Sequence, residues 1–317
     1  MPEPAQAAPE PVKATPDQAC TTARTTLEAA RKAGDLPKAI EAYGGMTKAE
    51  AGCDPKVLFC EGRATALAHV EQAYASADKG DAAAAAKLLA DGRKFGEPWP
   101  LLIGLGDAET ARAHASHNAK DWGAASLDYQ KAVLALAEPV LCDDEPARPA
   151  PAVIEGLYRK MSAALMLGTP IEFAHTKCAP CALAFLGPTA GFTPRSQPLP
   201  ITFQGRSALI TPEGLDAAKA LLGCILARKA SHVAISVHTD EGGSDAANKT
   251  MSEARLATLR KMFADGGYKG TFEAQPKGRS EPFVPDEPKS FTAEERHRLN
   301  RRVELRSATL DDALTCQ

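Results

Sequence analysis

The sequence predicts a chain of two structural classes, an α-helical N-terminal part followed by a C-terminal domain in which elements follow as β-α-β-α-β-β. With 317 residues, 44% of them hydrophobic, the chain is long enough for about two domains. Aromatic residues make up only 5% and alanine is frequent, which favours closely packed helices over a β-sandwich. After residue 200, strand-like alternation separates segments with helical periodicity, which is typical of an α/β domain.

The charge of the chain argues against one class of partner. There are 37 Lys and Arg residues against 40 Asp and Glu, a net charge of -3. Wrapping nucleic acid requires a clear positive field, so we expect no nucleic-acid partner. No apolar run approaches the roughly 18 residues that would span a bilayer, so we also expect no transmembrane segment.

Residues 1–19 are rich in Pro, Ala and Glu, and we expect them to be a disordered leader that acts as a tether. This start lacks the basic stretch and apolar core of a signal peptide. Residues 20–137 are expected to be helical, because an Ala-rich helix, a tight break and a second helix recur there. The recurring units are Ala29–Ala39 with a break at Gly34-Asp35, Tyr74–Ala84 with Gly80-Asp81, and Ala111–Ala125 with Lys120-Asp-Trp-Gly.

These units resemble tetratricopeptide-type helical hairpins. In the third unit, Ala111, Ala115 and Ala119 fall one helical turn apart, and small residues at this spacing let two helices approach closely. The breaks are spaced less regularly than the roughly 34 residues of that family, so the prediction is a TPR-like domain. The resemblance implies a protein partner, and an Ala-rich bundle without repeats is the alternative.

Residues 138–200 are expected to be a connector that carries prolines, cysteines and one helix over 152–167. The C-terminal domain, 201–308, then begins with a short strand at Ile201–Phe203. Thr211 and Pro212 predict the start of a helix, because threonine caps helices and proline suits the first helical position. Alternating apolar residues over 233–237 predict a second strand.

The later elements of this domain are predicted in the same way. Thr250-x-x-Glu253 has capping-box spacing and predicts the start of a second helix, which Gly266-Gly267 ends. Residues 269–275 and the apolar pair Val303 and Leu305 predict two more strands, and residues 309–317 a tail. This order implies helices stacked on one face of a small mixed sheet.

Residues 201–306 resemble the OmpA-like C-terminal domain, a family that binds peptidoglycan. The residues that carry the resemblance are Ile201-x-Phe203, His238-Thr239-Asp240, Gly243, Asn248, Met251-Ser252-x-x-Arg255, Pro282 and Asn300-Arg301-Arg302-Val303-Glu304. In that family the Asp of the His-Thr-Asp turn and the Arg of the next helix clamp the free end of diaminopimelate in the peptide stem. The resemblance therefore assigns the clamp to Asp240 and Arg255 and implies peptidoglycan as the partner.

The chemistry of this ligand suits such a pair. A diaminopimelate end bears an ammonium and a carboxylate on one carbon, so its receptor needs an anionic acceptor and a planar cationic fork a few ångströms apart. Four further candidates surround the pair: Thr239 in the turn, Asn248 as a cap of the helix or of the loop or as a ligand contact, Arg302 at the last strand and Arg206 in the loop Gly205-Arg206-Ser207. Arg301 and Arg302 alternate across the last strand, so only one of them is expected to face Asp240.

The even number of cysteines predicts disulfides in an oxidising compartment. The eight candidates are Cys20, Cys53, Cys60, Cys142, Cys178, Cys181, Cys224 and Cys316. We expect Cys142 to pair with Cys178 or Cys181, Cys53 with Cys60 or Cys20, and Cys224 with Cys316. Two rival readings remain, a thioredoxin-like pair at Cys178-Ala-Pro-Cys181 and a zinc site formed by Cys142, His175, Cys178 and Cys181.

No Ser/His/Asp or paired-carboxylate arrangement supports catalysis, so we expect no enzyme, no cofactor and no metal. The predicted function is non-covalent binding of peptidoglycan that anchors the helical domain to the cell wall. The alternative is an interaction scaffold whose OmpA-like domain no longer binds peptidoglycan. The resemblance and the cysteines together imply a periplasmic location, with outer-membrane association left open and a signal or lipidation sequence expected ahead of Met1.

Overall fold

The computed structural model describes residues 16–48, 52–168 and 189–306. It is a mixed α/β structure, mostly helical, with a small mixed sheet of four strands in the described part. The chain forms two compact units. The first unit contains α1 to α4 together with residues 141–145, and the second contains α5 to α10 and the sheet. Within the described residues, no helix is long and apolar enough to cross a membrane.

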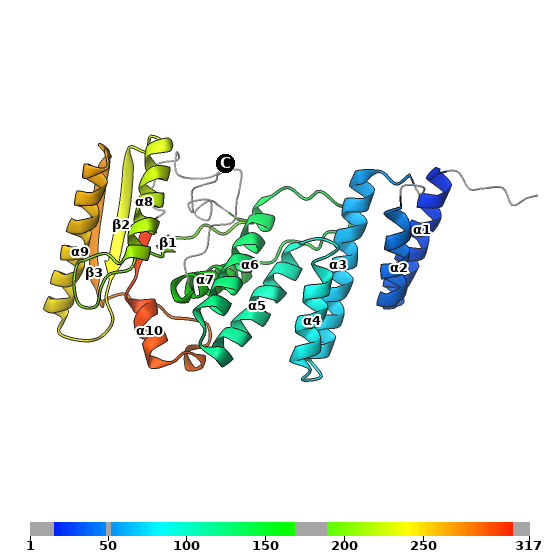
Figure 1. The fold of residues 1–317 in the computed structure, drawn as a ribbon, viewed down its shortest axis with the longest axis horizontal. Helices are drawn as coiled ribbons and strands as arrows, with labels where there is room; N and C mark the ends of the chain where they lie inside the picture. The colour runs from blue at the N-terminus through cyan, green and yellow to red at the C-terminus, as the bar shows by residue number, and fades with distance from the viewer. Residues whose placement is uncertain (1–15, 49–51, 169–188, 307–317) are drawn as a thin grey trace, which may run out of the picture. The chain divides into compact units, whose positions relative to one another are not determined.

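The first unit is built from two helical hairpins, α1 (Pro16–Lys32) with α2 (Leu36–Met46), and α3 (Pro55–Ala77) with α4 (Ala82–Gly92) (Figure 1). The breaks at Gly34-Asp35 and Gly80-Asp81 are confirmed. Both glycines have a positive φ, 69° and 83°, which an L side chain rarely adopts. Asp35 and Asp81 then cap the helices that follow, each accepting a hydrogen bond from a backbone N–H three residues on.

Two disulfides hold this unit together. Cys20 is bonded to Cys53 and Cys60 to Cys142. The first pairing is one of the two expected for Cys53. The expected pairing of Cys142 with Cys178 or Cys181 is wrong, because residues 141–145 belong to the first unit and Cys142 is bonded there to Cys60 of α3. Cys178, Cys181 and Cys316 lie outside the described residues.

Three long helices begin the second unit: α5 (Trp99–Ser116), α6 (Ala119–Ala137) and α7 (Pro151–Leu167). The third expected break, at Lys120-Asp-Trp-Gly, is misplaced. The chain turns at His117, which adopts the left-handed conformation with φ 51°, and Asn118 caps α6. Residues 120–123 lie inside α6, where Trp122 packs in the core, so the cap falls before them at Asn118.

The sheet has the strand order β1-β4-β2-β3. Its strands are β1 (Ser196–Leu199), β2 (His232–His238), β3 (Thr271–Gly278) and β4 (Val303–Arg306). β2 and β3 are parallel, whereas β4 is antiparallel to both β2 and β1. Two helices, α8 (Pro212–Ala227) and α9 (Asp245–Asp265), run alongside the strands (Figure 1). Both pack on the face that carries Val233, Ile235 and Val237, as expected for helices on one face of the sheet.

Several boundaries in this part differ from the sequence prediction. Ile201–Phe203 is not a strand, and β1 lies earlier in the chain. Pro198 is tolerated in β1 because β1 is an edge strand and pairs only with β4. The helix expected from Thr250 begins at Asp245, because Ser244 caps it by accepting from the backbone N–H of Ala247. The end of that helix at Gly266-Gly267 is confirmed.

The unit boundary also falls elsewhere than the sequence suggested. The helices α5 and α6 were assigned to a TPR-like domain over 20–137, but they belong to the compact unit that contains the sheet. The reason is a shared core, in which residues of α6 and α7 pack with Phe291 and Leu299 from the segment between β3 and β4.

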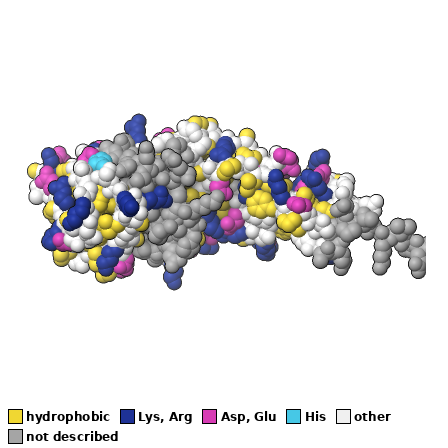
Figure 2. All heavy atoms as spheres, turned by 90° about the horizontal axis from the view of Figure 1, so that it is seen from above, with side chains coloured by type: hydrophobic (Ala, Val, Ile, Leu, Met, Phe, Trp, Pro, Cys, Tyr) yellow, Lys and Arg dark blue, Asp and Glu magenta, His cyan; other side chains and the backbone are white. Residues whose placement is uncertain are grey.

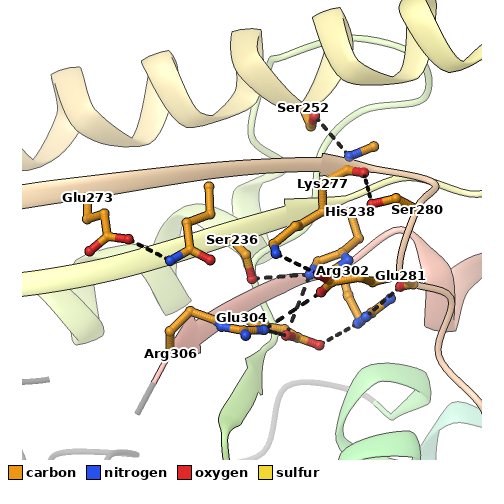
Figure 3. Close-up of polar contacts among 12 residues, drawn as sticks. Ser236, His238, Ser252, Glu273, Lys277, Ser280, Glu281, Arg302, Glu304 and Arg306 are labelled. Atoms are coloured by element: carbon orange, nitrogen blue, oxygen red, sulfur yellow. Dashed lines mark hydrogen bonds and ion pairs between the residues drawn. The ribbon is translucent and has the colours of Figure 1, made fainter. Parts of the chain in front are cut away.

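The second face of the sheet carries buried polar side chains (Figure 3). His238 and Glu304 lie on this face beside Ser236, with His238 Nε2 3.1 Å from Ser236 Oγ and 3.5 Å from Glu304 Oε2. Arg302 Nε donates to Glu304 Oε1 over 2.6 Å. Burial alone raises the pKa of Glu304, but the hydrogen bond from His238 and the charge of Arg302 outweigh it and leave that pKa well below its ordinary value.

Candidate functional site

Asp240 lies where the chain leaves β2 and enters the loop before α9. Its Oδ1 accepts a hydrogen bond from the backbone N–H of Gly242 over 3.1 Å, which fixes the carboxylate against its own loop. Its Oδ2 accepts from Arg301 Nη1 over 3.0 Å, and both side chains are partly exposed. The carboxylate is therefore oriented on both sides while one edge remains accessible to a ligand.

Arg255 projects from α9 and is almost fully buried, with 4% of the residue exposed. Its Nε donates to the carbonyl of Ser207 over 3.0 Å and its Nη2 to the carbonyl of Gly205 over 2.9 Å. The guanidinium carbon lies 4.8 Å from the centre of the Phe203 ring, a cation–π distance. The loop after β1 thus holds Arg255 in one position and leaves part of its guanidinium fork for another acceptor.

The charges of Asp240 and Arg301 both interact electrostatically with the Arg255 guanidinium. Burial lowers the pKa of the Arg255 guanidinium, the positive charge of Arg301 lowers it further, and the negative charge of Asp240 acts in the opposite direction. Arg301 lines the same cavity as Arg255 and is ion-paired with Asp240. Asp240 is therefore paired with Arg301, and Arg301 and Arg255 line one cavity, while the clamp formed by Asp240 and Arg255 stays a prediction.

The cavity beside this cluster has a volume of about 230 Å³. One wall is apolar and consists of the end of α7 and the chain from Leu199 to Phe203. The other wall is basic, with Arg255 from α9, Arg298 from α10 (Ala293–Asn300), and Arg301 and Arg302 just after it. Glu294 is the acidic residue of the lining, and it forms an ion pair with Arg301.

Three of the predicted contacts lie in or around the Asp240 loop. Thr239 is buried, and its backbone N–H donates to the carbonyl of Gly278 on β3. Asn248 is also buried and donates from Nδ2 to the carbonyl of Gly242, so it holds the Asp240 loop rather than capping α9, whose cap is Ser244. Arg206 is exposed and extends over Gly243, where an added Cβ would lie 2.7 Å from Arg206 Nη2. Arg206 therefore lies at the rim of the site.

Arg302 also lines this cavity, but its charged group is held in a second cluster. Its side chain is 5% exposed and is directed into the polar cluster on the second face of the sheet (Figure 3). There it donates to Glu304 and to the carbonyl of Glu281. Of the two consecutive arginines, Arg301 meets Asp240 and Arg302 holds β4 in place.

Sequence reasoning missed Arg298 and Glu294 because the helix that carries them, α10, was expected to be loop. The signal was present: Thr292 and Glu295 have capping-box spacing, and the structure forms that box, with each side chain bonded to the other's backbone N–H. Glu294, Arg298 and Arg301 are spaced by four and three residues, which places them on one face of the chain.

The rival readings of the cysteines receive little support from the described residues. Cys142 is bonded to Cys60, so it is not available as a thiolate ligand for the expected zinc set. The other members, His175, Cys178 and Cys181, lie outside the described residues. In the part of the chain that is described, no group of three or more His, Cys, Asp or Glu residues is arranged to hold a metal ion.

Basic and acidic side chains are interspersed on the face shown in Figure 2, in keeping with the net charge of -3. A comparison with protein-family models finds no match, and a comparison with curated proteins finds none either.

Proposed function

We propose that the α/β part of the second unit binds the free end of diaminopimelate in the stem peptide of peptidoglycan, and so anchors the helical hairpins to the cell wall. The observation that carries the proposal is the arrangement of Asp240 and Arg255 around Arg301, which forms an ion pair with Asp240 and lines one cavity with Arg255. The resemblance of residues 201–306 to the OmpA-like domain supports the same ligand.

The geometry suits a zwitterionic group. The ligand ammonium would approach Asp240, which has acceptor positions beyond those used by Gly242 and Arg301. The ligand carboxylate would meet Arg255, whose position is already fixed by two backbone carbonyls and the Phe203 ring. Because the cation is fixed before the ligand arrives, little side-chain entropy is lost on binding.

Cosedimentation of the full chain with purified, insoluble peptidoglycan tests this function. We expect the wild type to pellet and Asp240→Asn to lose about tenfold to a hundredfold in affinity, since each charge-assisted hydrogen bond contributes roughly 1.5–3 kcal/mol. Arg255→Gln should lose binding to a similar degree. Wild-type protein that remains in the supernatant would contradict the proposal.

A matched control separates loss of the site from loss of charge. Arg260→Gln removes the same charge from the same helix, but Arg260 is exposed and lies over Phe272, away from Asp240. It should pellet like the wild type. Because Arg255 is buried, its variant is compared with the wild type by circular dichroism and thermal unfolding before the binding result is interpreted.

A second candidate function is an interaction scaffold that recruits a protein partner through the helical hairpins. It is supported by a groove of about 780 Å³ in the first unit, lined by α1, α3 and residues 141–144. Glu61 lies buried in this groove and is paired with Arg24 and Arg31. Co-purification of one defined partner that is weakened by Lys56→Glu, together with no binding of peptidoglycan, would favour the scaffold.

The location that follows from the proposal is the periplasm. The two described disulfides are compatible with an oxidising compartment outside the cytoplasm.

A further inference from the structure

Two arginines that line the 230 Å³ cavity are held by backbone carbonyls rather than by acids. Arg255 donates to the carbonyls of Ser207 and Gly205, and Arg298 Nη2 donates to the carbonyls of Met166 and Leu167, 3.2 Å away in each case. Among the described residues, no carboxylate forms an ion pair with either guanidinium. Arg301, by contrast, is paired with both Asp240 and Glu294.

The two unpaired charges are close to a third. Burial lowers the pKa of Arg298, as it does that of Arg255, and in each case the charge of Arg301 lowers the pKa further. Arg301 therefore repels both guanidinium groups in a small cavity, whereas the charge of Asp240 at Arg255 and those of Glu294 and Glu295 at Arg298 act in the opposite direction. A bound anion at either of these guanidinium groups would relieve this repulsion. An arginine that donates to backbone carbonyls keeps further N–H groups that can donate to such an anion.

The cavity thus offers two positions for carboxylates, one at Arg255 and one at Arg298. Its volume lies below the roughly 300–1,000 Å³ of pockets for drug-sized ligands, so it suits one small group rather than a glycan chain. Diaminopimelate carries two carboxylates. The one beside the free ammonium suits Arg255, while the second is free only when the stem peptide ends at this residue.

We propose that Arg298 binds this second carboxylate, so that the protein prefers stem peptides that end at diaminopimelate over stems that continue beyond it. Arg301 lies between the two positions and orients both acids of the ligand. Glu294, which lines the same cavity, opposes the second carboxylate and limits the preference. This inference rests on the proposed function, because the first carboxylate and the ammonium define how the ligand enters.

The test uses the full chain and three synthetic peptides: L-Ala-γ-D-Glu-meso-diaminopimelate, the same peptide amidated at the peptide-side carboxylate, and the same peptide amidated at the carboxylate beside the free ammonium. Affinities are measured by calorimetric titration. We expect the first amide to bind about tenfold more weakly than the parent, the effect of one charge-assisted hydrogen bond, and the second amide to bind still more weakly.

Variants of α10 separate the two subsites. Arg298→Gln should bind the parent and the first amide equally, with the affinity that the wild type shows for the amide. Glu294→Gln should raise the preference for the parent severalfold, and because this side chain is 68% exposed the substitution leaves the fold intact. Thermal unfolding checks that Arg298→Gln, which loses a contact to α7, is folded, and Arg298→Lys, which keeps the charge, should retain most of the preference.

The outcomes distinguish the two proposals. Equal binding of parent and first amide by the wild type overturns the second subsite and leaves the clamp standing. A preference for the parent that persists in folded Arg298→Gln also overturns it. If the wild type binds none of the peptides, the proposed function and the second subsite both fail.

Discussion

Two buried charges in the α/β part are stabilised in different ways. Arg255 is surrounded by carbonyl dipoles and a ring face, which leave its net charge uncancelled for a ligand. Glu304 is held by Arg302, whose charge cancels its own within the fold, and lies beside His238. The first arrangement is suited to binding and the second to holding strands together, and this difference separates the proposed site residue Arg255 from the structural residue Glu304.

The Glu304 cluster gives a prediction for stability. Glu304→Gln removes one partner of a buried ion pair and should cost about 3 kcal/mol in the free energy of unfolding. Chemical denaturation at neutral pH measures this loss. The matching substitution Glu253→Gln, on the exposed surface of α9, should change stability by less than about 0.5 kcal/mol. A Glu304 variant as stable as the control would show that the ion pair contributes nothing.

The same residue makes a prediction for pH. The folded-state pKa of Glu304 lies below its ordinary value of 4.5, so the unfolded state takes up a proton first as the pH falls. The stabilisation from Glu304 is therefore complete above that value and is lost as the pH drops through the folded-state pKa. Below pH 4.5 the wild type should lose stability more steeply than Glu304→Gln.

At the same scale, sequence reasoning drew Asp240 and Arg255 from the resemblance to the OmpA-like domain, whose motifs lie on either side of one loop, and their role as a clamp stays a prediction. It could not choose between Arg301 and Arg302. Strand alternation was applied to both, whereas Arg301 is the residue that ends α10 and only Val303 begins the strand. The direction of a side chain at the end of a helix depends on the local backbone angles. An alternating pattern of residues does not predict these angles.

At the scale of elements, two helical glycines in the first unit should respond to alanine in opposite directions. A Cβ at Gly62 in α3 would press on the carbonyl oxygen of Phe95 and lie 2.8 Å from the Tyr43 hydroxyl. Nothing lies within 4 Å of a Cβ at Gly44 in α2. Gly62→Ala should therefore destabilise the protein by about 1–3 kcal/mol, and Gly44→Ala should stabilise it by about 0.5 kcal/mol.

Thermal unfolding of the two variants beside the wild type measures both changes. Equal and small shifts would mean that α3 and the end of α4 move apart at little cost. Because both substitutions replace glycine by alanine within a helix, the intrinsic gain in helix propensity is the same, and the difference reports the close approach at Gly62.

The sequence predicted most elements in this chain and several of their ends. The ends of helices were predicted correctly where a residue has one strong conformational preference. Examples are the positive-φ glycines Gly34 and Gly80 and the N-cap Thr211. Errors arose where two candidate caps competed, as with Ser244 and Thr250, or where a proline hid an edge strand, as at Pro198. Tertiary contacts decide these cases, and a single sequence does not show which strand lies at an edge.

At the scale of the whole molecule, the disulfides should contribute unequally. Cys60 and Cys142 are 82 residues apart, whereas Cys20 and Cys53 are 33 apart. In the chain-entropy view, the longer loop removes more freedom from the unfolded state, so its loss should cost about 4–5 kcal/mol against about 3–4 for the shorter one. Denaturant unfolding of Cys60→Ser/Cys142→Ser and Cys20→Ser/Cys53→Ser compares them, and a larger loss in the second would refute the order.

Domain boundaries were the least predictable feature at this scale. The amino-acid composition of the chain changes at residue 138, and α6 does end just before it. The compact units nevertheless divide after Glu97, and residues 141–145 rejoin the first unit. Their return depends on Cys142 and on Glu145, whose carboxylate pairs with Arg63 of α3, and neither contact has a local signature.

The return of residues 141–145 makes the first unit discontinuous, with the hairpin of α5 and α6 inserted between its two parts. During synthesis, Cys20, Cys53 and Cys60 therefore all emerge before Cys142 does. Until then Cys60 can form only non-native bonds, and closure of the bond between Cys20 and Cys53 before Cys142 emerges would prevent them. A fragment ending at Glu97 would leave Cys60 without its partner, so the first unit can be produced alone only if residues 141–145 are supplied, by a shortened connection or as a separate peptide.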